Sequence, residues 1–68
     1  MSKLFALSAS LVRSDGYTST SKMILGYRLI DSRESAIGSF TEMLIDQHRK
    51  YDIQEILCLE IPTTEVDD

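Results

Sequence analysis

The 68-residue sequence is short of the features that usually stabilise a very small protein. It has one cysteine, Cys58, one histidine, His48, and no tryptophan. A single cysteine excludes an internal disulfide and is typical of a reducing compartment. One cysteine and one histidine cannot complete the four-ligand set of a structural zinc site. Because chains of this size usually need such a support or a partner, the sequence predicts oligomerisation.

Long apolar runs are also missing, and none approaches the roughly 20 residues of a membrane span. The short apolar run after Lys3 is similar to the core of a secretion signal, but Ser8 interrupts it after four residues. Cleavage there would also remove a predicted strand. We therefore expect a cytoplasmic protein that does not contact the membrane.

A strong charge of one sign is absent from most of the chain. The sequence has 7 basic and 11 acidic residues, a net charge of −4. Three of the acidic residues lie in 62–68, which leaves 8 acidic against 7 basic residues in 1–61. A nearly neutral body disfavours both a nucleic-acid footprint and an acidic mimic of DNA. We expect one domain over 1–61 and an acidic, disordered tail over 62–68.

Two strands joined by a tight turn are predicted in the first half of the chain. Residues 4–12 alternate as a strand does, and Ser14-Asp15-Gly16 signals a turn before a second strand over 17–30. A two-residue loop, Asp15-Gly16, would place Leu7 on one face with Ile24, Gly26 and Arg28. A three-residue loop, with Gly16 in the left-handed region, pairs Leu7 with Met23 and Phe5 with Leu25. We prefer the three-residue loop because it gathers one continuous apolar face: Phe5, Leu7, Ala9, Leu11, Met23, Leu25, Tyr27 and Leu29.

A helix and a third strand complete the predicted α+β fold. Asp31 or Ser32 is a suitable helix cap, and helical spacing links Ala36, Ile37, Phe40, Met43 and Leu44. Residues 53–61 form the last strand, which Pro62 ends. The connection rules predict a ββαβ domain whose three-stranded antiparallel sheet has the order 2-1-3, with the helix on one face. The predicted covered side chains are Phe5, Leu7, Leu25, Leu57 and Leu59.

The opposite face of the predicted sheet is the candidate interface. Small residues lie at its centre, isoleucines flank them, and few charges interrupt the surface. A face exposed to water should alternate to charged residues, so we predict that a second protein surface covers it. The predicted interface residues are Ala6, Ser8, Ser10, Ile24, Gly26, Arg28, Ile56 and Cys58.

No residue pattern predicts catalysis or a cofactor. His48 lies among charges at the predicted helix end, and Cys58 lies in an apolar strand without a nearby base. The chain has no nucleophile elbow and no glycine-rich phosphate loop. Arg13, Tyr17 and Lys22, around the hairpin tip, are candidate ligands of an anion, although a flexible polar turn explains the same residues. We predict no enzyme activity, no metal and no cofactor.

The sequence therefore favours a small non-catalytic interaction module that acts as a homo-oligomer. Its partners would be a second copy and a further protein that it regulates, links or inhibits. The alternative is a protein that sequesters a phosphorylated or nucleotide-like ligand at a subunit interface, near Arg13, Lys22 or Arg28. Nucleic-acid binding ranks third because the body is not basic.

Overall fold

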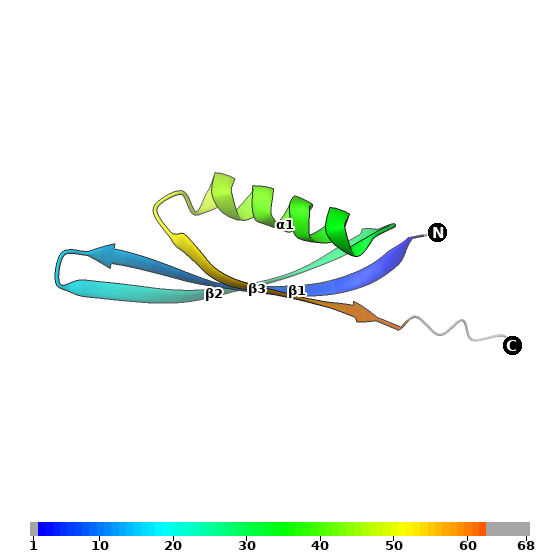
Figure 1. The fold of residues 1–68 in the computed structure, drawn as a ribbon, viewed down its shortest axis with the longest axis horizontal. Helices are drawn as coiled ribbons and strands as arrows, with labels where there is room; N and C mark the ends of the chain where they lie inside the picture. The colour runs from blue at the N-terminus through cyan, green and yellow to red at the C-terminus, as the bar shows by residue number, and fades with distance from the viewer. Residues whose placement is uncertain (1, 63–68) are drawn as a thin grey trace, which may run out of the picture.

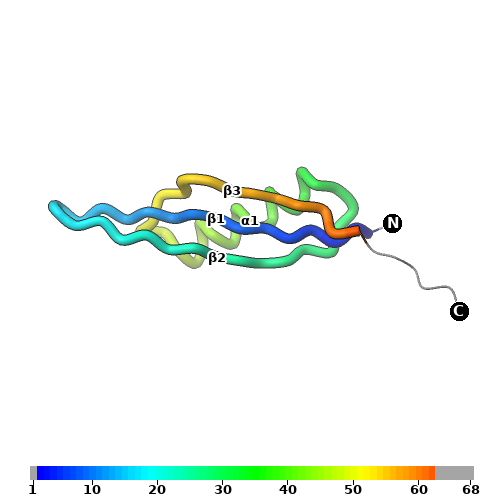
Figure 2. The backbone as a smooth tube through the Cα atoms, turned by 90° about the horizontal axis from the view of Figure 1, so that it is seen from below, coloured from blue at the N-terminus to red at the C-terminus, as the bar shows by residue number. Residues whose placement is uncertain are grey.

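The computed structural model describes residues 2–62, which form a ββαβ fold. The elements are strand β1 (Lys3–Asp15), strand β2 (Thr18–Ile30), helix α1 (Arg33–Gln47) and strand β3 (Asp52–Ile61). The sheet order is β2-β1-β3 and both pairings are antiparallel. Helix α1 covers one face of the sheet (Figure 1), and β1 lies between the other two strands (Figure 2). The predicted α+β fold and strand order are confirmed.

The hairpin register differs from the predicted one. Asp15 pairs with Thr18, so the loop consists of Gly16 and Tyr17. Gly16 has a φ of 63° and is the one residue with positive φ in 2–62, the pattern of a type II′ turn with glycine at its first central position. The positive φ of Gly16 is confirmed, but the three-residue loop is wrong.

The observed register places the opposite side of β2 toward the helix from the one predicted. Leu7 pairs with Gly26 instead of Met23. Because successive side chains point to opposite faces, an odd shift in register moves each β2 side chain to the other side of the sheet. On β3, Cys58 pairs with Leu7, so Leu57 and Leu59 also lie away from the helix. The helix covers Phe5 and Leu7 as predicted, but the prediction that it covers Leu25, Leu57 and Leu59 is wrong.

The core lies between α1 and the centre of the sheet. It is made of alternate residues of β1 and one stripe of α1, namely Phe5, Leu7, Ala9, Leu11, Ala36, Phe40 and Leu44. Half-buried side chains surround these, including Ile24, Ile56 and Cys58. A core of seven buried side chains is small, and it uses one face of the sheet only.

The ring of Phe40 in helix α1 packs directly against Gly26 of β2. A Cβ atom at that position would lie 2.8 Å from Cε1 of Phe40, so the absence of a side chain makes room for the ring. Arg28 lies against the same ring, with its guanidinium carbon 5.6 Å from the ring centroid. Its Nε donates a hydrogen bond to Oγ of Ser39 at 3.1 Å.

Both ends of α1 are closed by local hydrogen bonds. Oγ of Ser32 accepts from the backbone N–H of Ser35 at 3.2 Å, which confirms Ser32 as one of the two predicted caps. At the other end, the N–H of His48 donates to the carbonyl of Leu44 at 2.8 Å. The N–H of Tyr51 then donates to the carbonyl of His48 at 3.0 Å and leads the chain into β3.

Candidate interaction surface and basic pocket

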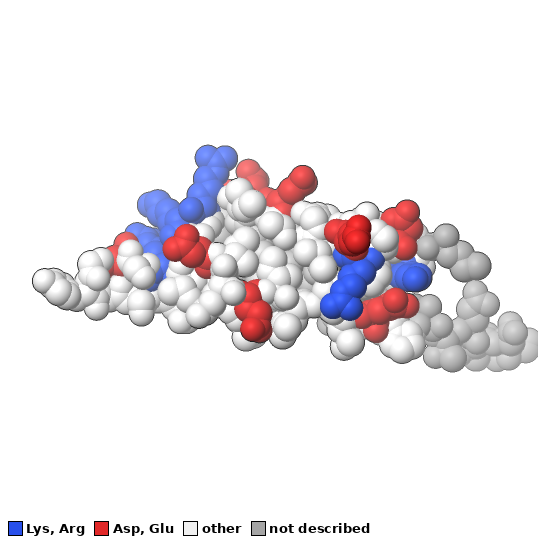
Figure 3. Space-filling model, in the orientation of Figure 1, with Lys and Arg blue, Asp and Glu red and all other residues white. Residues whose placement is uncertain are grey.

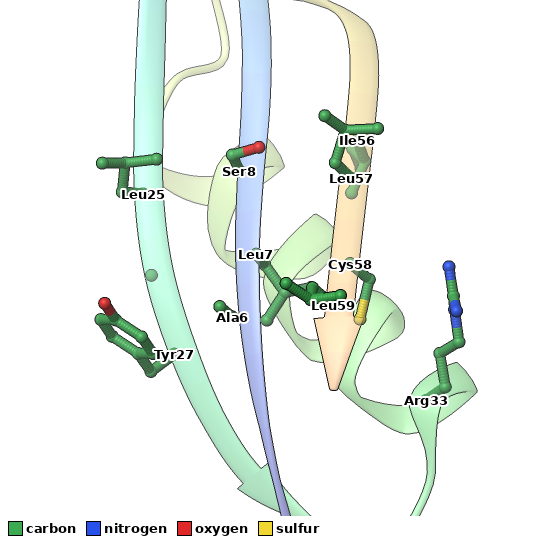
Figure 4. A pocket seen from close by; sticks show the side chains of 11 residues that line it. Ala6, Leu7, Ser8, Leu25, Tyr27, Arg33, Ile56, Leu57, Cys58 and Leu59 are labelled. Carbon is green, nitrogen blue, oxygen red and sulfur yellow. The ribbon is translucent and has the colours of Figure 1, made fainter. Parts of the chain in front are cut away.

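The face of the sheet opposite α1, called the open face below, carries two apolar ridges. Leu25 of β2 is 72% exposed, and Leu57 and Leu59 of β3 are 59% and 69% exposed. Tyr27 stands beside Leu25, as Figure 4 shows. Each ridge therefore presents large side chains that the fold itself leaves uncovered.

Small side chains of β1 separate the two ridges. Ser8 pairs with Leu25 on one side and Leu57 on the other. Because neighbouring strands lie about 4.8 Å apart, the ridges are about 10 Å apart. The resulting groove has a volume of about 500 Å³, and Ala6 and Ser8 contribute to its floor. A groove of this width can accept a row of apolar side chains from another surface.

The predicted interface residues divide between the two faces. Ala6, Ser8 and Ser10 lie on the open face, where the sequence placed them, because the alternation of β1 does not depend on the loop. The other five were predicted on the open face but lie on the face that α1 covers: Ile24, Gly26, Arg28, Ile56 and Cys58. Strands β2 and β3 each present to the helix the side that was predicted to face away from it.

The open face is richer in large apolar residues than the sequence reasoning predicted. Six exposed residues of this face were predicted to lie on the covered face instead: Met23, Leu25, Tyr27, Leu29, Leu57 and Leu59. For the four of them on β2, the signal that could have identified them is the dipeptide Gly16-Tyr17, since glycine followed by another residue suits a two-residue type II′ hairpin. The faces of Leu57 and Leu59 follow instead from the pairing of β3 with β1.

Cys58, the one cysteine of the chain, packs against the core. The thiol is half-buried against the core, and Cys58 pairs with Leu7. Within 2–62, no three histidine, cysteine, aspartate or glutamate residues come together in a way that could hold a metal ion.

A second concave region, the basic pocket, lies at the carboxyl end of α1. It has a volume of about 330 Å³, and its lining comes from β1, β2, α1 and the connection to β3: Arg13, Lys22, Asp46, Gln47, His48, Arg49, Lys50 and Tyr51. Figure 3 shows Lys and Arg side chains gathered at the hairpin end of the molecule. The structure thus brings together Arg13 and Lys22, two of the three predicted anion ligands. Tyr17, the third, is fully exposed in the loop and does not line the pocket.

Within the basic pocket, Tyr51 contacts both Lys22 and His48. Nζ of Lys22 lies 5.4 Å from the ring centroid of Tyr51, and the ring of His48 meets that of Tyr51 edge-on at 6.2 Å. Arg13 pairs with Asp15 at 2.9 Å between Nε and Oδ2. Lys22 contacts the Tyr51 ring and forms no ion pair with a carboxylate among residues 2–62.

No family model, curated protein or solved structure matches this chain. In the described part of the chain, α1 is neither long nor apolar enough to cross a membrane. Functional inference therefore rests on the open face and the basic pocket.

Proposed function

We propose that this chain is a small non-catalytic protein–protein interaction module that acts as a homo-oligomer, with two copies joined through the open face. The observation that carries the proposal is the exposure of Leu25, Leu57 and Leu59 side by side on one sheet face. Antiparallel sheets that face water usually alternate to polar residues. Contiguous apolar surface of this kind marks interaction sites.

A second copy suits this face because the face is self-complementary: it carries both an apolar ridge and a groove that can accept such a ridge. A two-fold axis that runs along the strands between β1 and β3 would set the Leu57–Leu59 ridge of each copy into the groove of the other, over Ala6 and Ser8. Such a contact buries the same residues twice. It also makes use of the groove, whereas ridges placed on ridges would leave a void between the copies.

Charge also permits this contact. The chain carries a net charge of −4, yet the central part of the open face is apolar or neutral. Glu55 on β3 pairs with Ser10 and lies two residues before Leu57, at one end of that ridge, and Arg33 reaches the rim of the groove from α1. Two copies can therefore meet through the apolar centre of this face, with the like charge of the contact confined to Glu55 at the end of each ridge.

The energy available from the leucines is large enough to matter. Fully burying a leucine gains about 1.5–3 kcal/mol, so a side chain already 59% exposed gains about 1–2 kcal/mol. Leu57 contributes this twice in a two-fold dimer. Replacing it by a charged residue removes that gain and adds the cost of desolvating the charge, so we expect the dimer dissociation constant to rise at least about 100-fold.

Two matched substitutions test the proposal. Leu57 and Ile45 are both 59% exposed, but Ile45 lies on α1, on the other side of the molecule. Leu57→Lys should yield a folded monomer, and Ile45→Lys should keep the assembly of the unchanged chain. Sedimentation velocity measures the assembly, and circular dichroism checks the fold.

Edge pairing is the competing geometry, because β2 and β3 each have one edge without a neighbouring strand in the described structure. An assembly that survives Leu57→Lys unchanged would contradict the open face as the contact and favour pairing through these edges. An unchanged chain that is monomeric would contradict homo-oligomerisation itself.

A further inference from the structure

We propose that the basic pocket binds a small molecule through a phosphate chain, as a diphosphate or triphosphate group. This inference is independent of the open face, since none of its residues lines the groove between the apolar ridges. The site is built by segments that are distant in the sequence. Arg13 and Lys22 come from the hairpin, and 46–51 come from the end of α1 and the connection that follows.

The charge of the pocket contrasts with that of the molecule. Four of its lining residues are cationic and one is acidic: Arg13, Lys22, Arg49 and Lys50 against Asp46. Arg13 is also paired with Asp15, so the local charge is +2 in a chain of −4. The carboxyl end of α1 carries a partial negative charge of about half a unit, which offsets only part of this excess. A multiply charged anion is the ligand that such an excess favours.

The cations of the pocket can be redirected to a ligand at little cost. Arg49 and Asp46 lie 3.7 Å apart, and their side chains are 80% and 75% exposed. Exposed ion pairs of this kind contribute about 0–1 kcal/mol. Lys22 lies against the ring of Tyr51 and makes no ion pair within 2–62. Lys22 and Arg49 are therefore available to donate charge-assisted hydrogen bonds to phosphate oxygens, whereas Arg13 is held by its ion pair with Asp15.

The dimensions of the pocket are sufficient for a phosphate chain. Its volume of about 330 Å³ is at the lower end of the range of small-molecule sites, about 300–1,000 Å³. Free triphosphate and the phosphate chain of a nucleotide offer the same chemistry to these cations. They differ in whether a base is present to contact the rings of His48 and Tyr51.

Isothermal titration calorimetry at low salt and constant pH tests the proposal with two probes, sodium triphosphate and ATP. The unchanged chain should bind triphosphate, and Lys22→Glu should weaken that binding at least tenfold. Lys3→Glu is the matched control, because it changes the net charge equally and lies at the other end of β1, with a side chain 54% exposed. That control should bind triphosphate within about twofold of the unchanged chain.

The two probes distinguish the sources of the phosphate chain. Tighter binding of ATP than of triphosphate would identify a nucleotide as the ligand, and equal binding would identify the phosphate chain alone. The proposal is overturned by the absence of binding of both probes at millimolar concentration, or by an equal loss in Lys22→Glu and Lys3→Glu. It is also overturned if a single-stranded oligonucleotide binds where triphosphate does not, since the site would then belong to a nucleic-acid backbone. Circular dichroism confirms that each variant is folded.

Discussion

Replacing Gly26 by alanine should destabilise the fold, because the new methyl group would meet the ring of Phe40. The added Cβ would lie 2.8 Å from Cε1 of that ring. Carbon atoms in contact normally lie about 3.5–4.0 Å apart, so the ring has to move by about 1 Å. Phe40 is completely buried, and Arg28 lies against the same ring. The ring therefore has little room to move.

Two opposing effects set the magnitude for Gly26→Ala. Adding a methyl group to a packed core typically costs about 1–3 kcal/mol. Replacing a glycine within a strand returns about 0.5–1 kcal/mol through the entropy of the unfolded chain. The steric cost is larger, and the free energy of unfolding should fall by about 1 kcal/mol. In a domain of this size, that lowers the melting temperature by about 4–8 °C.

Thermal unfolding followed by circular dichroism, at one protein concentration, measures this change, because self-association alone would shift the melting temperature. Gly38→Ala is the matched control: a Cβ there has no atom within 4 Å, and the residue lies inside α1. Alanine at position 38 should raise the free energy of unfolding by about 0.5–1 kcal/mol. In a Phe40→Leu background, the penalty of Gly26→Ala should shrink, because the two positions are coupled through the clash.

A Gly26→Ala variant that is as stable as the unchanged chain, or more stable, would refute this reasoning. That result would place Gly26 on the open face, as the three-residue loop requires. Equal penalties with and without the Phe40→Leu substitution would show that the ring does not lie over position 26.

Three further substitutions test other parts of the structure. Gly16→Val should cost about 1–2 kcal/mol in the free energy of unfolding, because valine resists the φ of 63° at that turn; chemical denaturation measures it, and an unchanged midpoint would contradict the turn. Ser32→Ala should cost about 1 kcal/mol by removing the cap of α1, and native-state hydrogen exchange should show faster opening of the first helical turn, with no change if Ser32 is not the cap. Ser8→Asp places a charge between Leu25 and Leu57, so light scattering should find a monomer, whereas an edge-paired assembly would persist.

The order and type of the elements were predictable because local signals agree with the fold. The alternation of β1 places its large apolar residues, such as Phe5 and Leu11, on one face whatever the loop, and Ser32 caps the helix by a contact three residues away. The placement of Ala6, Ser8 and Ser10 followed from the same alternation. These features depend on residues close in the sequence or on the period of a single strand.

The register of β2 was not predictable from apolar pattern, because both of its faces contain apolar residues. The more apolar face of β2, which includes Met23 and Leu25, was predicted to lie under the helix. The structure places the other set under the helix, where the ring of Phe40 packs over Gly26. The more apolar set is left exposed, and this is what favours a partner on the open face.

The basic pocket was only half predictable for a related reason. Arg13 and Lys22 flank the turn in the sequence, so their proximity was expected. The approach of Lys22 to Tyr51 depends on the register of β2, which places Lys22 opposite Leu11 on the face that α1 covers. The loop Gly16-Tyr17 sets that register, and it is neither of the two loops predicted from the sequence.

Sedimentation equilibrium of the unchanged chain over a range of micromolar concentrations is the most direct test of the central claim, that the open face joins two copies. The account predicts a mass of twice the 7.7 kDa of one chain, with dissociation on dilution that Leu57→Lys shifts to higher concentration and Ile45→Lys does not. A stable, folded species of 7.7 kDa at all of these concentrations would contradict it.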